Sequence, residues 1–152
     1  MLPRAERIGT SDFSTAFAQG RVLRHPLMAL RVYRRQIAAP GSSGRVGSSG
    51  GTRAAFAVSK KLGSAATRNR LRRRVREIYR LHALRGHSSL SRCDLIFMPT
   101  AAAIEASDGA LQEAVDQLLS RAAQRSPRVR WTAAKLPKSE SGAATTATDA
   151  GD

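Results

Sequence analysis

The chain has 152 residues, a formal net charge of +15 and a sequence pI of about 11.7, which together allow one domain with extensions and favour a polyanionic partner. It contains no apolar run of about 18 residues that would span a membrane, and no apolar signal-peptide core near the N-terminus. Cys93 is the single cysteine, so an intrachain disulfide is excluded, and we expect its side chain to be a small buried hydrophobic group. The lack of disulfides suits a reducing compartment, so we expect a cytoplasmic protein.

The first predicted element is a short helix over residues 11–20. Ser11 is a suitable N-cap, and Gly20 suits the end of the helix. Phe13 and Phe17 are four residues apart, so they share one helix face. Such a pair either packs into a core or forms an aromatic surface.

Residues 27–33 predict a strand, because apolar and mixed positions alternate along them. One face carries Met28, Leu30 and Val32, and the other carries Ala29, Arg31 and Tyr33. This pattern is typical of a sheet with one packed face and one open face.

Two segments of different character follow this strand. Residues 39–51 are rich in Gly and Ser, which predicts a flexible loop. Residues 53–59 predict a second strand, with Ala54, Phe56 and Val58 on its core face.

Residues 67–84 predict the main helix, with an apolar stripe along one side. The stripe consists of Leu71, Val75, Ile78, Tyr79 and His82. The other surfaces are basic, with Arg72, Arg73, Arg76 and Arg80 opposite the stripe and Arg68, Arg70 and Arg74 beside it. Like charges four residues apart destabilise a free helix, so we expect this surface to meet an anion.

The last predicted elements are a strand over 93–98 and a helix over 107–123. Ser107 is the expected helix cap, and the inward positions are Leu111, Val115, Leu118 and Leu119. From residue 126 onward Pro, Ser, Thr, Ala and Lys dominate. We therefore predict a single RNA-binding domain over 1–125 and a disordered tail over 126–152.

The positive charge is concentrated in residues 60–85, which contain ten Lys or Arg and one acid, Glu77. A solvated charged face, duplex DNA binding and folded RNA binding each account for such a segment. Eight of the ten basic residues are Arg, which binds phosphate with a planar fork and stacks on bases. The composition therefore favours nucleic acid over a membrane surface and leaves DNA and RNA open.

The stretch AFAVSKKLGSAATRNRLRRRVREIYR, residues 55–80, resembles the signature of the bacterial ribonuclease P protein component family. That pattern is an Arg-containing strand, then Ser-Lys-Lys, a Gly turn, and Arg-Asn-Arg at the start of a basic helix. Here those positions are Arg53, 59–61, Gly63 and 68–70, and the resemblance extends over roughly residues 10–123.

The chain departs from the family pattern in three places. Ser64 follows the Gly turn where Asn is common, and the 39–51 loop is longer than usual. The strand after Asp94 ends Met-Pro-Thr, where Ala-Arg-Pro is common. The Arg-rich block itself matches.

The resemblance implies an α+β fold, a two-layer sandwich in which helices pack against a small mixed β-sheet. It also implies a left-handed β-α-β crossover. General rules predict a right-handed crossover, so the left hand is expected from the resemblance alone.

The resemblance further implies the protein subunit of ribonuclease P, an endoribonuclease whose catalytic RNA and Mg²⁺ remove the 5′ leader from precursor tRNA. The residues themselves show no paired-His metal motif and no carboxylate cluster in 1–85, so no protein catalytic residue is expected. His25, His82 and His87 lack ligand-like spacing. The expected partners are the catalytic RNA and precursor tRNA, without a membrane or a protein homo-oligomer.

Two binding surfaces are expected from the resemblance. The surface for the catalytic RNA consists of Lys60, Lys61, Arg68, Asn69, Arg70, Arg72, Arg73 and Arg76. The surface for the precursor-tRNA leader is a cleft between the first helix and the open sheet face, formed by Phe13, Phe17, Ala29, Arg31 and Tyr33. An aromatic surface suits any leader sequence, because every base has a π-face.

Other interpretations stay open at this point. Core packing for the Phe pair, cross-strand filling for Tyr33 and solvated turn charge for Lys60 and Lys61 are the structural alternatives. The functional alternatives are a structural ribosomal or chromosome-coating nucleic-acid-binding protein, and a protein-only nuclease.

Overall fold

The computed structural model describes residues 1–36 and 50–124. Except for Gly50 and Gly51, the predicted 39–51 loop lies outside these residues, as does the predicted 126–152 tail. The helices are η1 (Arg4–Glu6), α1 (Thr10–Gln19), η2 (Lys60–Leu62), α2 (Ala65–Leu81), η3 (Ser88–Leu90), α3 (Ala102–Glu105) and α4 (Asp108–Gln124). The strands are β1 (Arg21–Arg24), β2 (Met28–Arg34), β3 (Arg53–Phe56) and β4 (Cys93–Pro99).

The described residues form a four-stranded mixed sheet with the order β1-β2-β4-β3. Strand β2 is antiparallel to β1 and to β4, whereas β3 and β4 are parallel. The chain therefore crosses from β3 to β4 through α2. The predicted β-α-β crossover is confirmed, and its hand stays a prediction.

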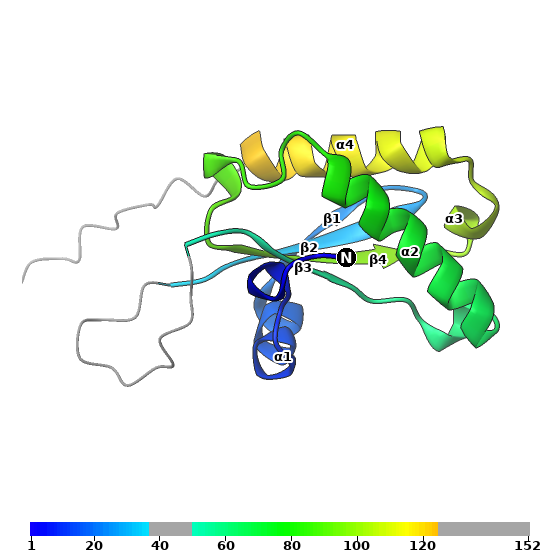
Figure 1. The fold of residues 1–152 in the computed structure, drawn as a ribbon, viewed down its shortest axis with the longest axis horizontal. Helices are drawn as coiled ribbons and strands as arrows, with labels where there is room; N and C mark the ends of the chain where they lie inside the picture. The colour runs from blue at the N-terminus through cyan, green and yellow to red at the C-terminus, as the bar shows by residue number, and fades with distance from the viewer. Residues whose placement is uncertain (37–49, 125–152) are drawn as a thin grey trace, which may run out of the picture.

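Helices α2 and α4 cover one face of the sheet, and the short α1 lies on the other face (Figure 1). This arrangement confirms the predicted α+β fold with a small mixed sheet packed by helices. Helix α1 is the element that makes a second, smaller layer on the face predicted to be open.

The main core lies between the sheet and the α2–α4 layer. The predicted alternation in β2 is confirmed, because Met28 and Leu30 are fully buried and Val32 packs against the same cluster. Phe97 of β4, Val75 of α2 and Leu118 of α4 complete the centre of this core. Cys93 is buried with a free thiol, as predicted, and burial raises the pKa of that thiol.

The helix boundaries differ from the predictions by a few residues. Helix α2 starts at Ala65 because the Ser64 hydroxyl accepts a hydrogen bond from the Thr67 amide at 3.2 Å. Helix α1 starts at Thr10, with Gly9 as its N-cap, so the predicted Ser11 cap is wrong. The predicted Ser107 cap is confirmed by its hydrogen bond from the Ala110 amide.

Strand β1 was not predicted from the sequence. Its four residues, Arg21–Arg24, place two arginines around Val22 and Leu23, and only Leu23 is buried. Pairing with β2 rather than its own hydrophobic pattern makes this segment a strand. Within 1–36 and 50–124, none of the helices has the length and apolar character needed to cross a membrane.

Candidate nucleic-acid interface

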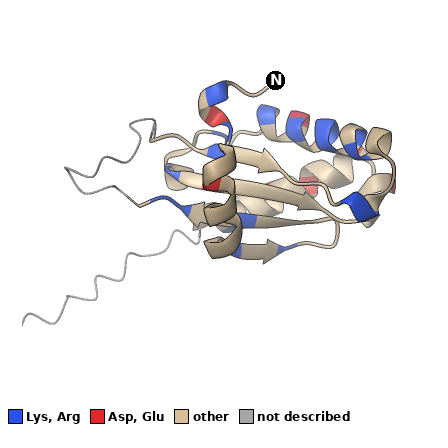
Figure 2. Ribbon diagram, turned by 90° about the horizontal axis from the view of Figure 1, so that it is seen from below, with Lys and Arg blue, Asp and Glu red and all other residues tan. Residues whose placement is uncertain are grey.

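The rotation of α2 about its axis is fixed by its buried residues. Leu71, Val75 and Tyr79 are each at most 2% exposed, and the Tyr79 ring lies 5.2 Å from that of Phe97. Burial of the Tyr79 hydroxyl raises its pKa to about 12. This stripe faces the sheet, so the remaining sides of the helix face away from the core. Basic residues occupy successive turns of those sides (Figure 2).

Three of the arginines in 60–85 bind carboxylates of the chain itself. Arg74 contacts Asp108 at 2.7 Å and donates to the Ala106 carbonyl, so it links α2 to the start of α4. Arg80 pairs with Glu77 on the same helix at 2.5 Å. Arg85 pairs with Glu6 at 2.8 Å, and this pair joins the end of the α2 region to η1.

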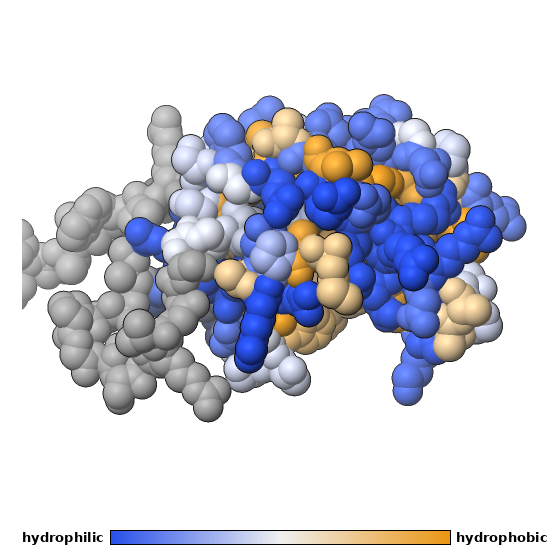
Figure 3. All heavy atoms as spheres, viewed as in Figure 1, coloured by the Kyte–Doolittle hydropathy of each residue, from blue (hydrophilic) through white to orange (hydrophobic). Residues whose placement is uncertain are grey.

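The other seven basic residues of 60–85 have no acidic partner within the described parts of the chain, and five of them form an open cation cluster apart from Arg72 and Arg76. This open cation cluster comprises Lys60, Lys61, Arg68, Arg70 and Arg73. All except the half-buried Arg68 are exposed, and hydrophilic side chains cover the face formed by α2 and the preceding turn (Figure 3). The Arg68 Nε is shielded from solvent and has no hydrogen-bond acceptor among the described residues.

The turn before α2 places the two lysines of this cluster beside the amino end of the helix. The Ser59 hydroxyl accepts a hydrogen bond from the Lys61 amide at 3.3 Å. Gly63 has a φ of +115°, a conformation that favours glycine. Ser64, which replaces the Asn common in the family pattern, supplies the N-cap of α2.

Arg72 and Arg76, both predicted to bind RNA, lie toward the edge of the sheet. The Arg72 Nε donates to the Phe56 carbonyl at 3.3 Å, and the Arg76 guanidinium carbon lies 5.7 Å from the centre of the Phe56 ring. Asn69 accepts a hydrogen bond from Arg72 at 2.7 Å, so it orients that arginine. The structure thus divides the predicted RNA-binding set into outward and edge-facing residues.

On the opposite side of the sheet, α1 presents an aromatic pair. The rings of Phe13 and Phe17 stack with their centroids 5.8 Å apart, and Phe17 is 40% exposed. Neither ring belongs to the main core or packs against it. The core-packing alternative for this pair is therefore wrong.

Arg31 of β2 connects the sheet to this aromatic pair. Its guanidinium carbon lies 4.3 Å from the centre of the Phe17 ring, within the range of a cation–π contact. The same side chain donates to the main-chain carbonyls of Phe17 and Gly20. Arg31 is therefore held beneath the carboxyl end of α1.

Ala29 and Tyr33 are half-buried residues of β2 that lie on the same strand face as Arg31, as predicted. Tyr33 lines a hollow of about 370 Å³ between α1 and the sheet, together with Thr15 and Gln19 of α1. The structure thus brings Arg31 and Tyr33 to α1, and Ala29 lies two residues before Arg31 on the same strand face.

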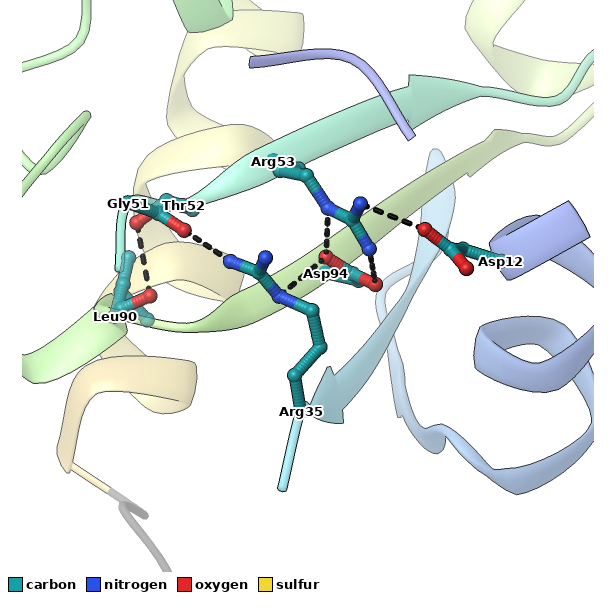
Figure 4. Close-up of polar contacts among 7 residues, drawn as sticks. All are labelled: Asp12, Arg35, Gly51, Thr52, Arg53, Leu90 and Asp94. Atoms are coloured by element: carbon teal, nitrogen blue, oxygen red, sulfur yellow. Dashed lines mark hydrogen bonds and ion pairs between the residues drawn. The ribbon is translucent and has the colours of Figure 1, made fainter. Parts of the chain in front are cut away.

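A buried ion network beneath α1 was not predicted from the sequence (Figure 4). Asp94 is fully buried and accepts two hydrogen bonds from Arg53, at 2.8 and 2.6 Å. Arg53 also contacts Asp12 of α1 at 2.8 Å, and Arg35 contacts Asp94 at 3.2 Å. This network therefore ties α1 to β3, β4 and the end of β2.

The network changes the proton affinity of both arginines. The hydrogen bonds that Arg53 donates to Asp94 hold the pKa of Arg53 above its ordinary value, whereas burial lowers the pKa of Arg35. Arg35 also donates to the Gly51 carbonyl. An Arg at the first position of one otherwise apolar strand and an Asp at the second position of another are the sequence signal that would have identified this pair.

The histidines make local contacts. His25 and His87 each accept a hydrogen bond from the amide two residues later, and His82 lies 3.1 Å from Asp116 with a side chain that is 9% exposed. Within 1–36 and 50–124, no three His, Cys, Asp or Glu residues form a group able to hold a metal ion.

Comparison with known proteins gives one consistent family. The model of the family described as Ribonuclease P matches residues 2–123. A ribonuclease P protein component of Desulfosudis oleivorans is 37% identical over 79 residues, 51% of this chain and 62% of that relative. One of Streptomyces avermitilis is 40% identical over 83 residues, 53% of this chain and 63% of that relative. Both matches therefore span less than two thirds of the relative.

A third relative and two solved structures extend the comparison. The ribonuclease P protein component of Symbiobacterium thermophilum is 30% identical over 110 residues, 72% of this chain and 84% of that relative. The RNase P protein of Staphylococcus aureus has a TM-score of 0.60 at 22% identity, covering 78% of this chain and 96% of that one. The RNase P protein of Thermotoga maritima has a TM-score of 0.59 at 22% identity, covering 76% and 96%. The structural likeness shows the same fold.

Proposed function

The chain belongs to the ribonuclease P protein family, and from this premise we propose that it is the protein subunit of a ribonuclease P holoenzyme. In this proposal a catalytic RNA hydrolyses the bond between the 5′ leader and the mature tRNA. The protein binds that RNA with α2 and the leader with α1. The reaction takes place in the cytoplasm.

The observation that carries the proposal is the open cation cluster. Five cations around the first turns of α2 lack carboxylate partners in the described chain, although other arginines on the same helix have them. Keeping five like charges together without a counterion is unfavourable for the protein alone. RNA phosphates supply the missing negative charge, and Arg binds them with a bidentate fork.

The proposed leader site is the surface between α1 and the sheet. Phe17 is exposed and stacked on Phe13, which gives a flat apolar surface for a single-stranded base. Arg31 lies against the Phe17 ring and provides a positive charge beside the backbone of a bound strand. Tyr33 and Ala29 lie farther along the same strand face.

Magnesium enters the proposal as a cofactor bound mainly by the RNA. When bound there, Mg²⁺ would activate the attacking water and stabilise the leaving oxygen. The protein's own contribution is to neutralise phosphates and to position the leader. No residue of the chain is assigned to proton transfer or to the cleavage step.

Cleavage of precursor tRNA at low Mg²⁺ concentration tests the proposal. Three samples are compared: the catalytic RNA alone, this chain alone, and the two combined. We expect efficient cleavage in the combined sample only. Cleavage by the chain alone would identify a protein-only nuclease, and RNA binding without stimulated cleavage would identify a structural nucleic-acid-binding protein.

A further inference from the structure

A cavity of about 250 Å³ lies between the N-terminal segment, β3 and α2. One side of the cavity is apolar and includes Leu2, Ile8 and Phe56. The guanidinium groups of Arg7, Arg72 and Arg76 also line it. No acidic residue lines it. This cavity is separate from the leader surface, which lies between α1 and the sheet.

The cavity exists because the edge of the sheet is only partly covered. Strand β3 is at one end of the strand order, and the N-terminal segment reaches it through a single bridge between Arg7 and Ala54. The Ile8 amide donates to the Ala54 carbonyl at 3.4 Å. Two residues farther along β3, Arg72 of α2 binds the Phe56 carbonyl, so the space between these two contacts stays open.

The chemistry of the lining suits a flat, negatively charged ligand. Phe56 stacks on Phe97 with centroids 5.4 Å apart and an angle of 10° between the rings, so it is the outer member of an aromatic stack. Arg76 lies over the Phe56 ring and has no acidic partner within the described chain. Planar guanidinium groups and aromatic rings are the groups on which unstacked RNA bases pack.

We propose that this cavity binds one unstacked nucleotide of the RNA partner, with its base packed against Phe56 and Arg76 and its phosphate near Arg7 and Arg72. The inference rests on the proposed function and extends it from phosphate binding to the recognition of an extruded base. The cavity is smaller than the roughly 300–1,000 Å³ of sites for drug-sized ligands, which suits a single base. The absence of carboxylates in its lining favours an anion over a cation.

Three hairpin RNAs of equal length test the proposal with the full chain. One carries a single bulged adenosine, one an abasic nucleotide at the same place, and one is fully paired. We expect the wild type to bind the bulged adenosine roughly fivefold or more tightly than the abasic RNA, because one stacked base is lost. 2-Aminopurine at the bulge should lose fluorescence on binding, since stacking quenches it.

Two substitutions and one control assign the effect to the cavity. Arg76→Lys keeps the charge and removes the planar group, so the preference should fall to about twofold or less while binding of the paired hairpin holds. Phe56→Leu should act similarly, with circular dichroism confirming the fold. Arg80→Lys, on the same helix but paired with Glu77, should keep the full preference.

The results separate failure of this inference from failure of the proposed function. If the wild type binds all three hairpins equally and still stimulates precursor cleavage, the nucleotide site is wrong and the proposed function stands. If it binds no RNA and does not stimulate cleavage, both are wrong. Binding of a glutamate-rich peptide without discrimination among the hairpins would assign the cavity to an acidic protein and would also overturn the inference.

Discussion

The two faces of this protein use arginine in opposite ways. On the α1 face, Arg53 and Arg35 are held by a fully buried carboxylate, Asp94, and their charge is used within the fold. On the α2 face, the open cation cluster has no carboxylate within the described chain. The same residue type therefore stabilises the structure where a buried carboxylate binds it and is available to a partner where no carboxylate does.

This difference shows why a count of basic residues overstates a binding surface. Of the ten Lys and Arg in 60–85, three pair with the chain's own carboxylates and two line the cavity beside β3. The other five form the open cation cluster. Only a structure separates these groups, because all ten occupy one basic stretch of sequence.

The largest expected effect comes from breaking the buried network. Asp94→Ala leaves Arg53 and Arg35 without their carboxylate, and loss of one partner of a buried ion pair costs about 3–5 kcal/mol. Urea denaturation measures the free energy of unfolding. Asp108→Ala, which removes the exposed partner of Arg74, is the control and should cost about 1 kcal/mol or less. Equal losses would show that the two kinds of ion pair do not differ.

The next effect concerns the buried side of α2 and depends on pH. Burial raises the pKa of Tyr79 to about 12, so the folded state holds this proton more tightly than the unfolded chain, whose tyrosine pKa is about 10. The resulting stability is complete below pH of about 10 and is lost as the pH rises through about 12. Its size is on the order of 2–3 kcal/mol.

Tyr79→Phe should therefore reduce the fall in unfolding free energy between about pH 10 and 12, as measured by urea denaturation at each pH. The Cys93 thiol, whose pKa is also raised by burial, contributes equally to both proteins. An identical pH dependence for wild type and variant would mean that the Tyr79 hydroxyl is accessible to solvent.

A smaller effect is expected on the aromatic side. Phe17→Ala removes an exposed ring, so we expect weaker binding of leader-bearing precursor by about 1–3 kcal/mol and unchanged binding of mature tRNA. Titration of the holoenzyme with both RNAs measures the difference. Leu81→Ala, at another exposed hydrophobic residue, is the matched control and should change neither affinity. Equal weakening for precursor and mature tRNA would exclude leader recognition by Phe17.

The smallest effect is a gain. Glu77→Gln removes the negative charge paired with Arg80 and makes that guanidinium more available to phosphate. The dependence of catalytic-RNA affinity on salt should become steeper, by at most about 0.7–0.9 in the log–log slope. An unchanged slope would place Arg80 outside the reach of the RNA backbone.

The sequence predicted the fold correctly where the spacing of apolar residues and the family pattern indicated the same element. The α2 stripe, the alternation in β2 and the Ser107 cap are confirmed. Strand β1 was missed because its pairing with β2 outweighs its weak pattern. The Arg53–Asp94 pair was missed because its residues are 41 positions apart and meet only when β3 and β4 align.

Among the predicted site residues, the sequence placed Phe13 and Phe17 on one face but left core packing open, which the structure excludes. It grouped Arg72 and Arg76 with the outward arginines, whereas both turn toward Phe56 at the sheet edge. Helical spacing gives the direction in which a side chain leaves the helix. The direction in which a long arginine then bends depends on the carbonyls and rings nearby.

The salt dependence of catalytic-RNA binding most directly tests the difference between arginines of the open cation cluster and arginines paired with carboxylates. The double variant Arg70→Ala/Arg73→Ala removes two members of the open cation cluster, and Arg80→Ala/Arg85→Ala removes two arginines paired with Glu77 and Glu6. We expect the first variant to reduce the magnitude of the log–log slope by roughly 1.4–1.8 and the second to reduce it by less than half as much. Equal reductions, or no reduction in the first variant, would contradict the assignment of this cluster to RNA phosphates.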